Sequence, residues 1–289
     1  MLVLSAIGFG FMPLFREWSV RDGCGTVTML ALRFAIAGAV LVGWCALARK
    51  KLPAGHILGV LTVMGAALYV GESLGYFKAI DAGASPALVA MLLYTYPAIV
   101  TVGARVFFKE RVTRIRWAAV LLAMLGTGLT VWGPMDAAPV KGIALGLFTA
   151  ASYAAYILVG SRLPKDVDPA VSSCVVIVSA ALVLCGAAAI TRSPMPQSSL
   201  GWLGIACLAL VSTVMSLTLF LAGLRLAGPV RASTISTVEA LTAVVVSSAF
   251  LGERLSPLQM IGGGLIIVAA VMSAKYGGNS TTQPDKGAS

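Results

Sequence analysis

Charged side chains are scarce in this chain: they make up 11% of its 289 residues, whereas hydrophobic residues make up 58%. So few polar groups cannot cover a water-soluble globule, and lipid must replace part of the solvent. Among the charged residues the acidic ones are fewer, with 11 Asp and Glu against 21 Lys and Arg. The basic residues stand in short clusters between apolar runs, which is not the pattern of a nucleic-acid-binding surface.

Histidine is nearly absent, and no two cysteines have the spacing of a metal or redox motif. His56 is the single histidine, so a His-based metal cluster or a Ser-His-Asp triad has almost no residues to draw on. The five cysteines show no CxxC spacing and are expected to be reduced packing residues. We therefore expect no cofactor, no metal and no enzyme activity. A membrane-embedded lipid-modifying enzyme is the less favoured alternative, because such enzymes usually carry acidic clusters.

Long apolar runs recur along the whole chain. A bilayer core of about 30 Å needs about 20 apolar helical residues, because a spanning segment must satisfy its own backbone hydrogen bonds. The predicted fold class is therefore all-α integral membrane, with ten transmembrane helices. The spans are expected near residues 1–19, 27–48, 56–78, 84–104, 115–133, 140–160, 169–190, 200–224, 229–250 and 256–275.

Lys and Arg are divided unequally between alternate loops. The side that holds the N-terminus carries 14 of the 21, the other side carries 6, and Arg33 lies inside a span. The positive-inside rule then puts both termini in the cytoplasm. We expect a multi-pass protein of the bacterial inner membrane, ending in a disordered cytoplasmic tail over residues 277–289.

The second half of the chain repeats the first. A shift of 143 residues aligns 74–111 with 217–254 without a gap, matching Pro86 with Pro229 and the pair Glu110-Arg111 with Glu253-Arg254. Five spans in each half force the second half into the membrane upside down. Inverted repeats are typical of transporters that work by alternating access, with a site near the midplane between the halves.

Short motifs at the end of the fourth span of each half, at 107–112 and 249–255, together with Arg33-Phe34 and Pro97, resemble the drug/metabolite transporter superfamily in its ten-helix, EamA-type branch. The resemblance implies an EamA-like five-helix repeat over 1–136 and an inverted one over 137–276. It also implies a cavity lined by the third, fourth, eighth and ninth spans. The ninth span departs from the family, which often has Glu-Pro where this chain has Glu239-Ala240; this departure weakens a predicted kink.

Three ionisable residues lie inside predicted spans, where a charge is costly and usually faces a cavity or a partner. Glu72 has Tyr69 and Tyr76 at helical spacing, so one face presents a carboxylate and two phenols. That face suits an amino group, although a Glu at the interface beside a tyrosine belt is the alternative. Glu239 is the second acid. Arg33 is expected to be structural, paired with a carboxylate or with helix carbonyls.

Broken and hydroxyl-rich segments supply the other candidates. Tyr94 precedes Pro97, where proline either exposes backbone acceptors or makes a structural kink. Ser236 on one span, and Ser212 with Ser216 on another, either contact solute or hold helices together. The predicted substrate-binding residues are Tyr69, Glu72, Tyr76, Tyr94, Ser212, Ser216, Ser236 and Glu239; Tyr153 and Tyr156 are lining or packing residues.

The resemblance implies an exporter of small metabolites. Amino acids are the preferred solute, because acidic and aromatic groups suit an ammonium with an apolar side chain. A phosphorylated solute fits less well, since Arg33 is the one cation expected to be buried. Transport of another solute class, such as a drug or a sugar, is the alternative. The expected partners are a small-molecule solute, the lipid bilayer and, as a further hypothesis from the depth of the two acids, protons.

Overall fold

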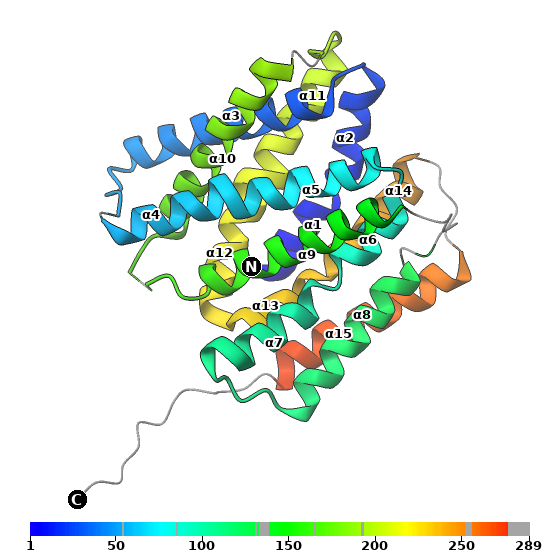
Figure 1. Ribbon diagram of the computed structural model, residues 1–289. Helices are drawn as coiled ribbons and strands as arrows, with labels where there is room; N and C mark the ends of the chain where they lie inside the picture. The colour runs from blue at the N-terminus through cyan, green and yellow to red at the C-terminus, as the bar shows by residue number, and fades with distance from the viewer. Residues whose placement is uncertain are drawn as a thin grey trace, which may run out of the picture.

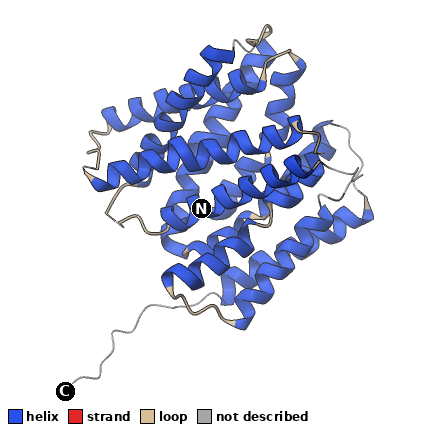
Figure 2. Ribbon diagram, viewed as in Figure 1, coloured by secondary structure: helices blue, strands red, loops and turns tan. Residues whose placement is uncertain are grey.

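The computed structural model describes residues 1–53, 55–84, 86–130, 132, 139–164, 166–191, 194–251 and 256–276. Every regular element in these ranges is a helix, and they contain no strand (Figure 2). The predicted all-α membrane class is confirmed. The expected boundary at 136/137, the Glu253-Arg254 pair and the tail over 277–289 fall outside the described residues.

The first half contains five spans, three of which are interrupted. The second span, α3, and the fifth, α8, are continuous, whereas the first and fourth are each split into two helices and the third contains a π-helix, η1. Their bounds are α1 (Leu2–Gly10) and α2 (Met12–Arg21), α3 (Thr26–Leu47), α4 (His56–Val63), η1 (Met64–Tyr69) and α5 (Val70–Asp81), α6 (Pro86–Leu93) and α7 (Tyr96–Phe108), and α8 (Arg114–Thr130).

The second half shows the same pattern after an unbroken first span. A π-helix, η2, again lies within its third span, and its fourth span is again split. The bounds are α9 (Val140–Gly160), α10 (Pro169–Thr191), α11 (Ser199–Ala209), η2 (Leu210–Met215) and α12 (Ser216–Ala227), α13 (Pro229–Ser236) and α14 (Val238–Leu251), and α15 (Pro257–Tyr276). By length and composition, eight of the described spans qualify as membrane-crossing helices. The broken first span and the 17-residue α8 complete the ten.

Helix boundaries repeat with the interval expected from the sequence. The starts of α3 and α10, of α6 and α13, and of α8 and α15 are 143 residues apart: 26 and 169, 86 and 229, 114 and 257. The ends of α7 and α14, at 108 and 251, show the same separation. The two halves therefore share both a sequence register and a helical plan.

Packing between the halves follows a two-fold relationship. The second spans of the two halves, α3 and α10, pack together at one end of the molecule, and the fifth spans, α8 and α15, pack together at the other (Figure 1). The third span of each half packs on the first span of the other: α5 on α9, and α11 with α12 on α1 and α2. At the α8–α15 contact, a Cβ added to Gly126 would lie 2.8 Å from the carbonyl oxygen of Gly262, so the two backbones touch there.

Contacts between loops show which ends of the spans lie on the same side of the molecule. On one side, Lys50 pairs with Asp168 at 2.7 Å, and Arg162 pairs with Glu110 at 3.7 Å. On the other side, the Asp22 carboxylate accepts hydrogen bonds from two backbone N–H groups of the 194–198 segment. The first side holds the clusters of Lys and Arg counted from the sequence, so the structure supports the division of loops on which the orientation argument rests.

Candidate functional site

Interrupted helices bring the site together. The fourth span breaks at Tyr94 and Thr95, just before α7, whose second residue is Pro97, as the sequence predicts. The ninth span breaks at Thr237, which is 143 residues after Tyr94, although no proline follows there. The expectation that Ala240 would weaken this kink is wrong, because the helix is interrupted without the proline. Helix breaks in mid-membrane occur where protein or a polar space can satisfy the freed backbone groups.

Two carboxylates, one from each half, face the centre. Glu72 of α5 and Glu239 of α14 interact electrostatically with each other and with Arg33. Both lie deep in the helix bundle, yet each residue keeps some accessible surface. A deep residue keeps such surface only where a water-sized space adjoins it. The Glu72 carboxylate accepts a hydrogen bond of 2.9 Å from the hydroxyl of Ser73. The reading of Glu72 as an interfacial residue is therefore not supported.

Aromatic rings form a continuous chain next to the acids. Phe34 contacts Tyr69 edge-on with centroids 5.3 Å apart, and Tyr69 stacks on Tyr156 at 5.5 Å. Tyr156 lies 6.4 Å from Tyr153, which meets Tyr96 at 4.7 Å. Tyr94 continues the chain beyond Tyr96, and Phe220 closes it against Tyr153 and Tyr156. Rings from five spans thus make one wall, which is apolar in body and carries phenol groups.

Arg33 joins the two halves without an ion pair. Its Nε donates to Thr213 Oγ1 at 2.6 Å, and its Nη2 donates to the Ser212 carbonyl at 3.2 Å. Its Nη1 lies 3.4 Å from Met12 Sδ. Arg33 was expected to pair with a carboxylate or with helix carbonyls. Among the described residues no carboxylate pairs with it, and its observed oxygen acceptors are one helix carbonyl and one hydroxyl. The two acceptors lie on η2, whose wide turn presents them to α3.

The hydroxyls of Ser212 and Ser216 both donate to backbone carbonyls in this conformation, and the Ser212 bond joins two helices. The Ser212 hydroxyl donates to the Gly8 carbonyl at 2.7 Å, and the Ser216 hydroxyl donates to the Val211 carbonyl within its own helix. Ser5 donates in turn to the Ser216 carbonyl at 2.7 Å. Both predicted serines are fully buried. Their hydroxyl protons are already used, which fits the packing alternative better than direct contact with solute.

One buried hydroxyl near the rings, that of Tyr156, makes no hydrogen bond within the part of the chain that the structure describes. The Ser236 hydroxyl interacts with that of Tyr96. The Tyr96 hydroxyl itself donates to the Ser233 carbonyl at 3.1 Å. A buried polar group without a partner costs free energy, so the Tyr156 hydroxyl is a natural place for a ligand atom or a water molecule. The sequence left Tyr156 between lining and packing; its unpaired hydroxyl favours lining, whereas its lack of accessible surface favours packing.

Arg16 is a basic residue near the site that sequence reasoning missed. Its guanidinium lies 5.4 Å from the Phe77 ring centroid and interacts electrostatically with Tyr76. The expectation that Arg33 is the single buried cation is wrong, because Arg116 is also buried, and Arg16 Nε is enclosed although the residue as a whole is half-buried. Arg16 lies inside the predicted first span, so its position could have indicated burial, but the count of Lys and Arg treated it as a loop residue.

The structure thus gathers most of the predicted residues. Tyr69, Glu72, Tyr76, Tyr94, Ser236 and Glu239 surround one central region, whereas Ser212 and Ser216 serve the α1–η2 contact beside it. The described residues contain no group of three or more His, Cys, Asp or Glu that could hold a metal ion. The arrangement offers two acids, two guanidinium groups and a phenol-lined wall, which suit binding rather than bond-breaking chemistry.

The sequence matches the EamA-like transporter family over residues 1–132 and 140–274. This chain belongs to the EamA-like transporter family. The two matched segments correspond to the two halves described above. An EamA-like protein of the drug/metabolite transporter superfamily is a membrane transporter, and that function holds for this chain.

Similar proteins carry transporter names. The "Uncharacterized transporter YwfM" of Bacillus subtilis is 28% identical over 173 residues, which cover 57% of this chain and 56% of that protein. The "Uncharacterized transporter YcbK" of the same organism is 26% identical and covers 94% of this chain and 91% of its own length. The "Uncharacterized inner membrane transporter YedA" of Escherichia coli K12 is 24% identical, with coverage of 84% and 80%. A crystal structure at 20% identity matches with a TM-score of 0.78 over 94% of this EamA-like chain and 95% of its own, which shows the shared fold.

Proposed function

We propose that this EamA-like transporter exports amino acids or similar small metabolites by alternating access through the centre of the molecule. The observation that carries the proposal is the pair Glu72 and Glu239, contributed by opposite halves and bordered by the tyrosine wall. A carboxylate binds an ammonium group, and aromatic faces accept both a cation and an apolar side chain. A site shared by the halves is reshaped whenever the halves move relative to each other.

Counterflow of labelled amino acids in proteoliposomes tests this proposal. Glu72→Gln and Glu239→Gln keep the side-chain volume and remove the charge, so we expect counterflow to fall at least tenfold in both. Glu17→Gln is the matched control, because Glu17 lies on α2 in a partly exposed pair with Arg21 at 2.7 Å. Wild-type counterflow in both site variants would overturn the proposed role of the acids.

Solute class is tested by competition. Amino acids and sugar phosphates compete in the same counterflow assay, since Arg16 and Arg33 give an anionic solute some support. We expect amino acids to compete and sugar phosphates not to, because phosphate sites usually gather several cations or a helix N-terminus, whereas this region holds two acids as well as the two guanidinium groups. If sugar phosphates competed and amino acids did not, the proposed solute would be a phosphorylated metabolite instead of an amino acid.

The orphan hydroxyl of Tyr156 gives a finer test of the binding region. Tyr156→Phe removes a hydroxyl that makes no hydrogen bond within the described protein, so folding stability should hold or rise while the KM for solute increases. Tyr96→Phe is the comparison, because it deletes the bond to the Ser233 carbonyl and should lower stability by about 1 kcal/mol. Equal KM values in wild type and Tyr156→Phe would remove this residue from the site.

Proton exchange and membrane orientation belong to the same proposal. The depth of Glu72 and Glu239 suggests that solute leaves in exchange for protons, and an imposed pH gradient should then drive transport. Indifference to the gradient would leave facilitated diffusion. For orientation, both termini lie in the cytoplasm, so an impermeant maleimide added to intact cells should modify Gln197→Cys and spare Lys51→Cys. Both positions are exposed in loops on opposite sides.

A further inference from the structure

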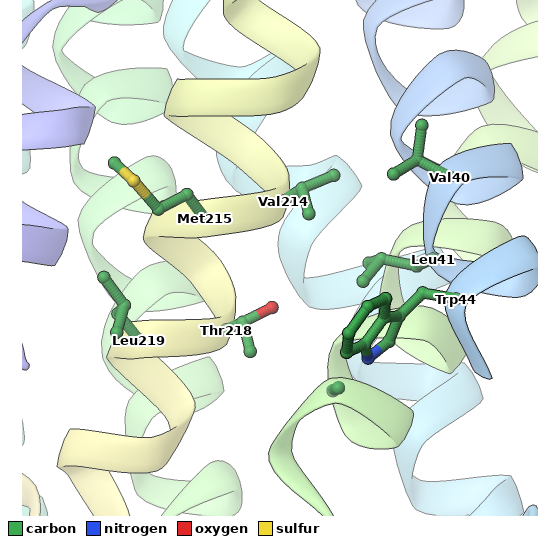
Figure 3. A pocket seen from close by; sticks show the side chains of 8 residues that line it. Val40, Leu41, Trp44, Val214, Met215, Thr218 and Leu219 are labelled. Atoms are coloured by element: carbon green, nitrogen blue, oxygen red, sulfur yellow. The ribbon is translucent and has the colours of Figure 1, made fainter. Parts of the chain in front are cut away.

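An apolar groove runs along the outside of the molecule between α3 and the eighth span. It has a volume of about 350 Å³ and opens toward the membrane rather than toward the central acids. Figure 3 shows Val40, Leu41 and Trp44 on one wall and Val214 with Thr218 on the other. Ala170, near the start of α10, also lines the groove. Val40 and Trp44 are 41% and 59% exposed, so lipid reaches them directly.

Polar donors interrupt the apolar lining. The Thr218 hydroxyl is enclosed, makes no hydrogen bond within the described residues and points across the groove toward Trp44 (Figure 3). The indole of Trp44 is itself a donor without acceptor capacity. Hydrocarbon tails offer nothing to these donors, whereas the ester and phosphate oxygens of a phospholipid are acceptors. The groove therefore fits a lipid whose chain enters it and whose oxygens stay near its mouth.

Charge at the mouth favours one class of headgroup. α3 ends three residues after Trp44, and the run Arg49-Lys50-Lys51 follows directly. Lys50 is bound to Asp168, two residues from the groove residue Ala170, so this acid is neutralised. Arg49 and Lys51 are exposed on either side of that pair. Exposed basic residues at the membrane surface attract anionic lipids.

We propose that this groove is a binding site for an anionic phospholipid. One acyl chain packs against Val40, Leu41 and Val214, the ester region accepts a hydrogen bond from Thr218, and the headgroup lies against Arg49 and Lys51. Val214 belongs to η2, whose inner face carries Ser212 and Thr213. These two residues hydrogen-bond to Gly8 and Arg33, respectively. A bound lipid would therefore brace the outer face of the element that joins the halves. The inference is independent of the solute proposed above.

Native mass spectrometry of the purified full chain tests the site with two lipids of identical acyl chains, phosphatidylglycerol and phosphatidylcholine. We expect wild type to retain one phosphatidylglycerol with roughly thirtyfold preference, in line with two basic residues at the surface. Val40→Trp fills the groove and should abolish that retained lipid. Val42→Trp is the matched control, because Val42 is on the same helix, is 49% exposed and does not line the groove.

A loop variant keeps the test independent of groove packing. Arg49→Gln combined with Lys51→Gln leaves all the groove residues intact and should reduce the preference to near unity. Equal retention of phosphatidylglycerol by Val40→Trp and Val42→Trp would overturn the site. Equal retention of the two lipids by wild type would show that the site does not select an anionic headgroup. Displacement of both lipids by an equimolar neutral alkyl detergent would show that the groove holds only ordinary boundary lipid or an apolar solute, which would also overturn the proposal.

Discussion

The guanidinium Nε of Arg33 donates a 2.6 Å hydrogen bond to the hydroxyl of Thr213, which lies 180 residues away in the other half of the chain. Thr213 also donates to the Leu208 carbonyl at 2.8 Å, so its hydroxyl is used in both directions. A charged donor, a hydroxyl and a carbonyl therefore connect α3 to η2. The connection uses a buried charge, which is costly to leave without partners.

A double-mutant cycle measures this connection. Arg33→Met and Thr213→Val should each lower the free energy of unfolding in detergent, the first by roughly 2 to 4 kcal/mol because it also empties the place beside Met12 and the Ser212 carbonyl. We expect the coupling energy to be about 0.6 kcal/mol and no more than about 1.7. Strict additivity of the two changes would show that the bond contributes nothing of its own.

Close backbone contact at Gly65 gives a sharper prediction. A Cβ on Gly65 would lie 2.1 Å from the carbonyl oxygen of Val176, so any side chain forces η1 away from α10. Gly65→Ala should lower the melting temperature markedly, by an amount equivalent to about 1 to 3 kcal/mol. Gly59→Ala, in the same span, meets nothing within 4 Å and should be neutral or slightly stabilising because alanine favours helix. Equal melting temperatures for the two variants would contradict the contact.

Two cysteines report on the α3–α10 contact. The thiols of Cys45 and Cys174 lie within hydrogen-bond reach of each other across these helices, and both residues are buried. Mild oxidation should join them. Denaturing alkylation of the oxidised protein should then add three adducts instead of the five that the reduced chain accepts, and Cys45→Ser should restore alkylation of Cys174. Five adducts after oxidation would show that the helices pack in another register.

Acid should weaken the contact at Asp22. The backbone N–H of Ser198 holds the pKa of this carboxyl below its ordinary value, with the N–H of Gln197 contributing in the same direction. A depressed pKa in the folded state means that the stabilisation is complete above the unfolded value of about 3.9 and is lost as the pH falls through the folded one. The melting difference between wild type and Asp22→Asn should therefore shrink below about pH 4. Asp81→Asn, in an exposed pair with Lys78, is the control and should show little difference at any pH.

Sequence patterns were sufficient for the span positions and for the repeat. The predicted span over 140–160 coincides with α9, and other boundaries lie within a few residues of the observed ones, because the bilayer fixes how long an apolar helix must be. The interval of 143 residues reappears in helix starts and in the break at Thr237. Both are properties that local residue chemistry and chain length determine.

Side-chain pairing within the site was harder to predict. The π-helices η1 and η2 have no obvious signature in their residues, and they decide that Ser212 meets Gly8 and that Arg33 meets Thr213. Arg16 was counted with the loop residues, although its guanidinium lies 5.4 Å from the Phe77 ring centroid. Such relations depend on the rotation of each helix about its axis, which apolar periodicity defines weakly when a span is hydrophobic on all sides.

The pairs α3–α10 and α8–α15 clamp the two halves at opposite ends of the molecule (Figure 1). Both contacts join one half to the other, so in the proposed alternating access a solute would be admitted by bending of the spans between them. The interruptions of those spans, at η1, at η2 and near Thr95 and Thr237, are where such bending is expected. Glu72 follows η1 by three residues and Glu239 follows Thr237 by two, so bending at these points would move both acids.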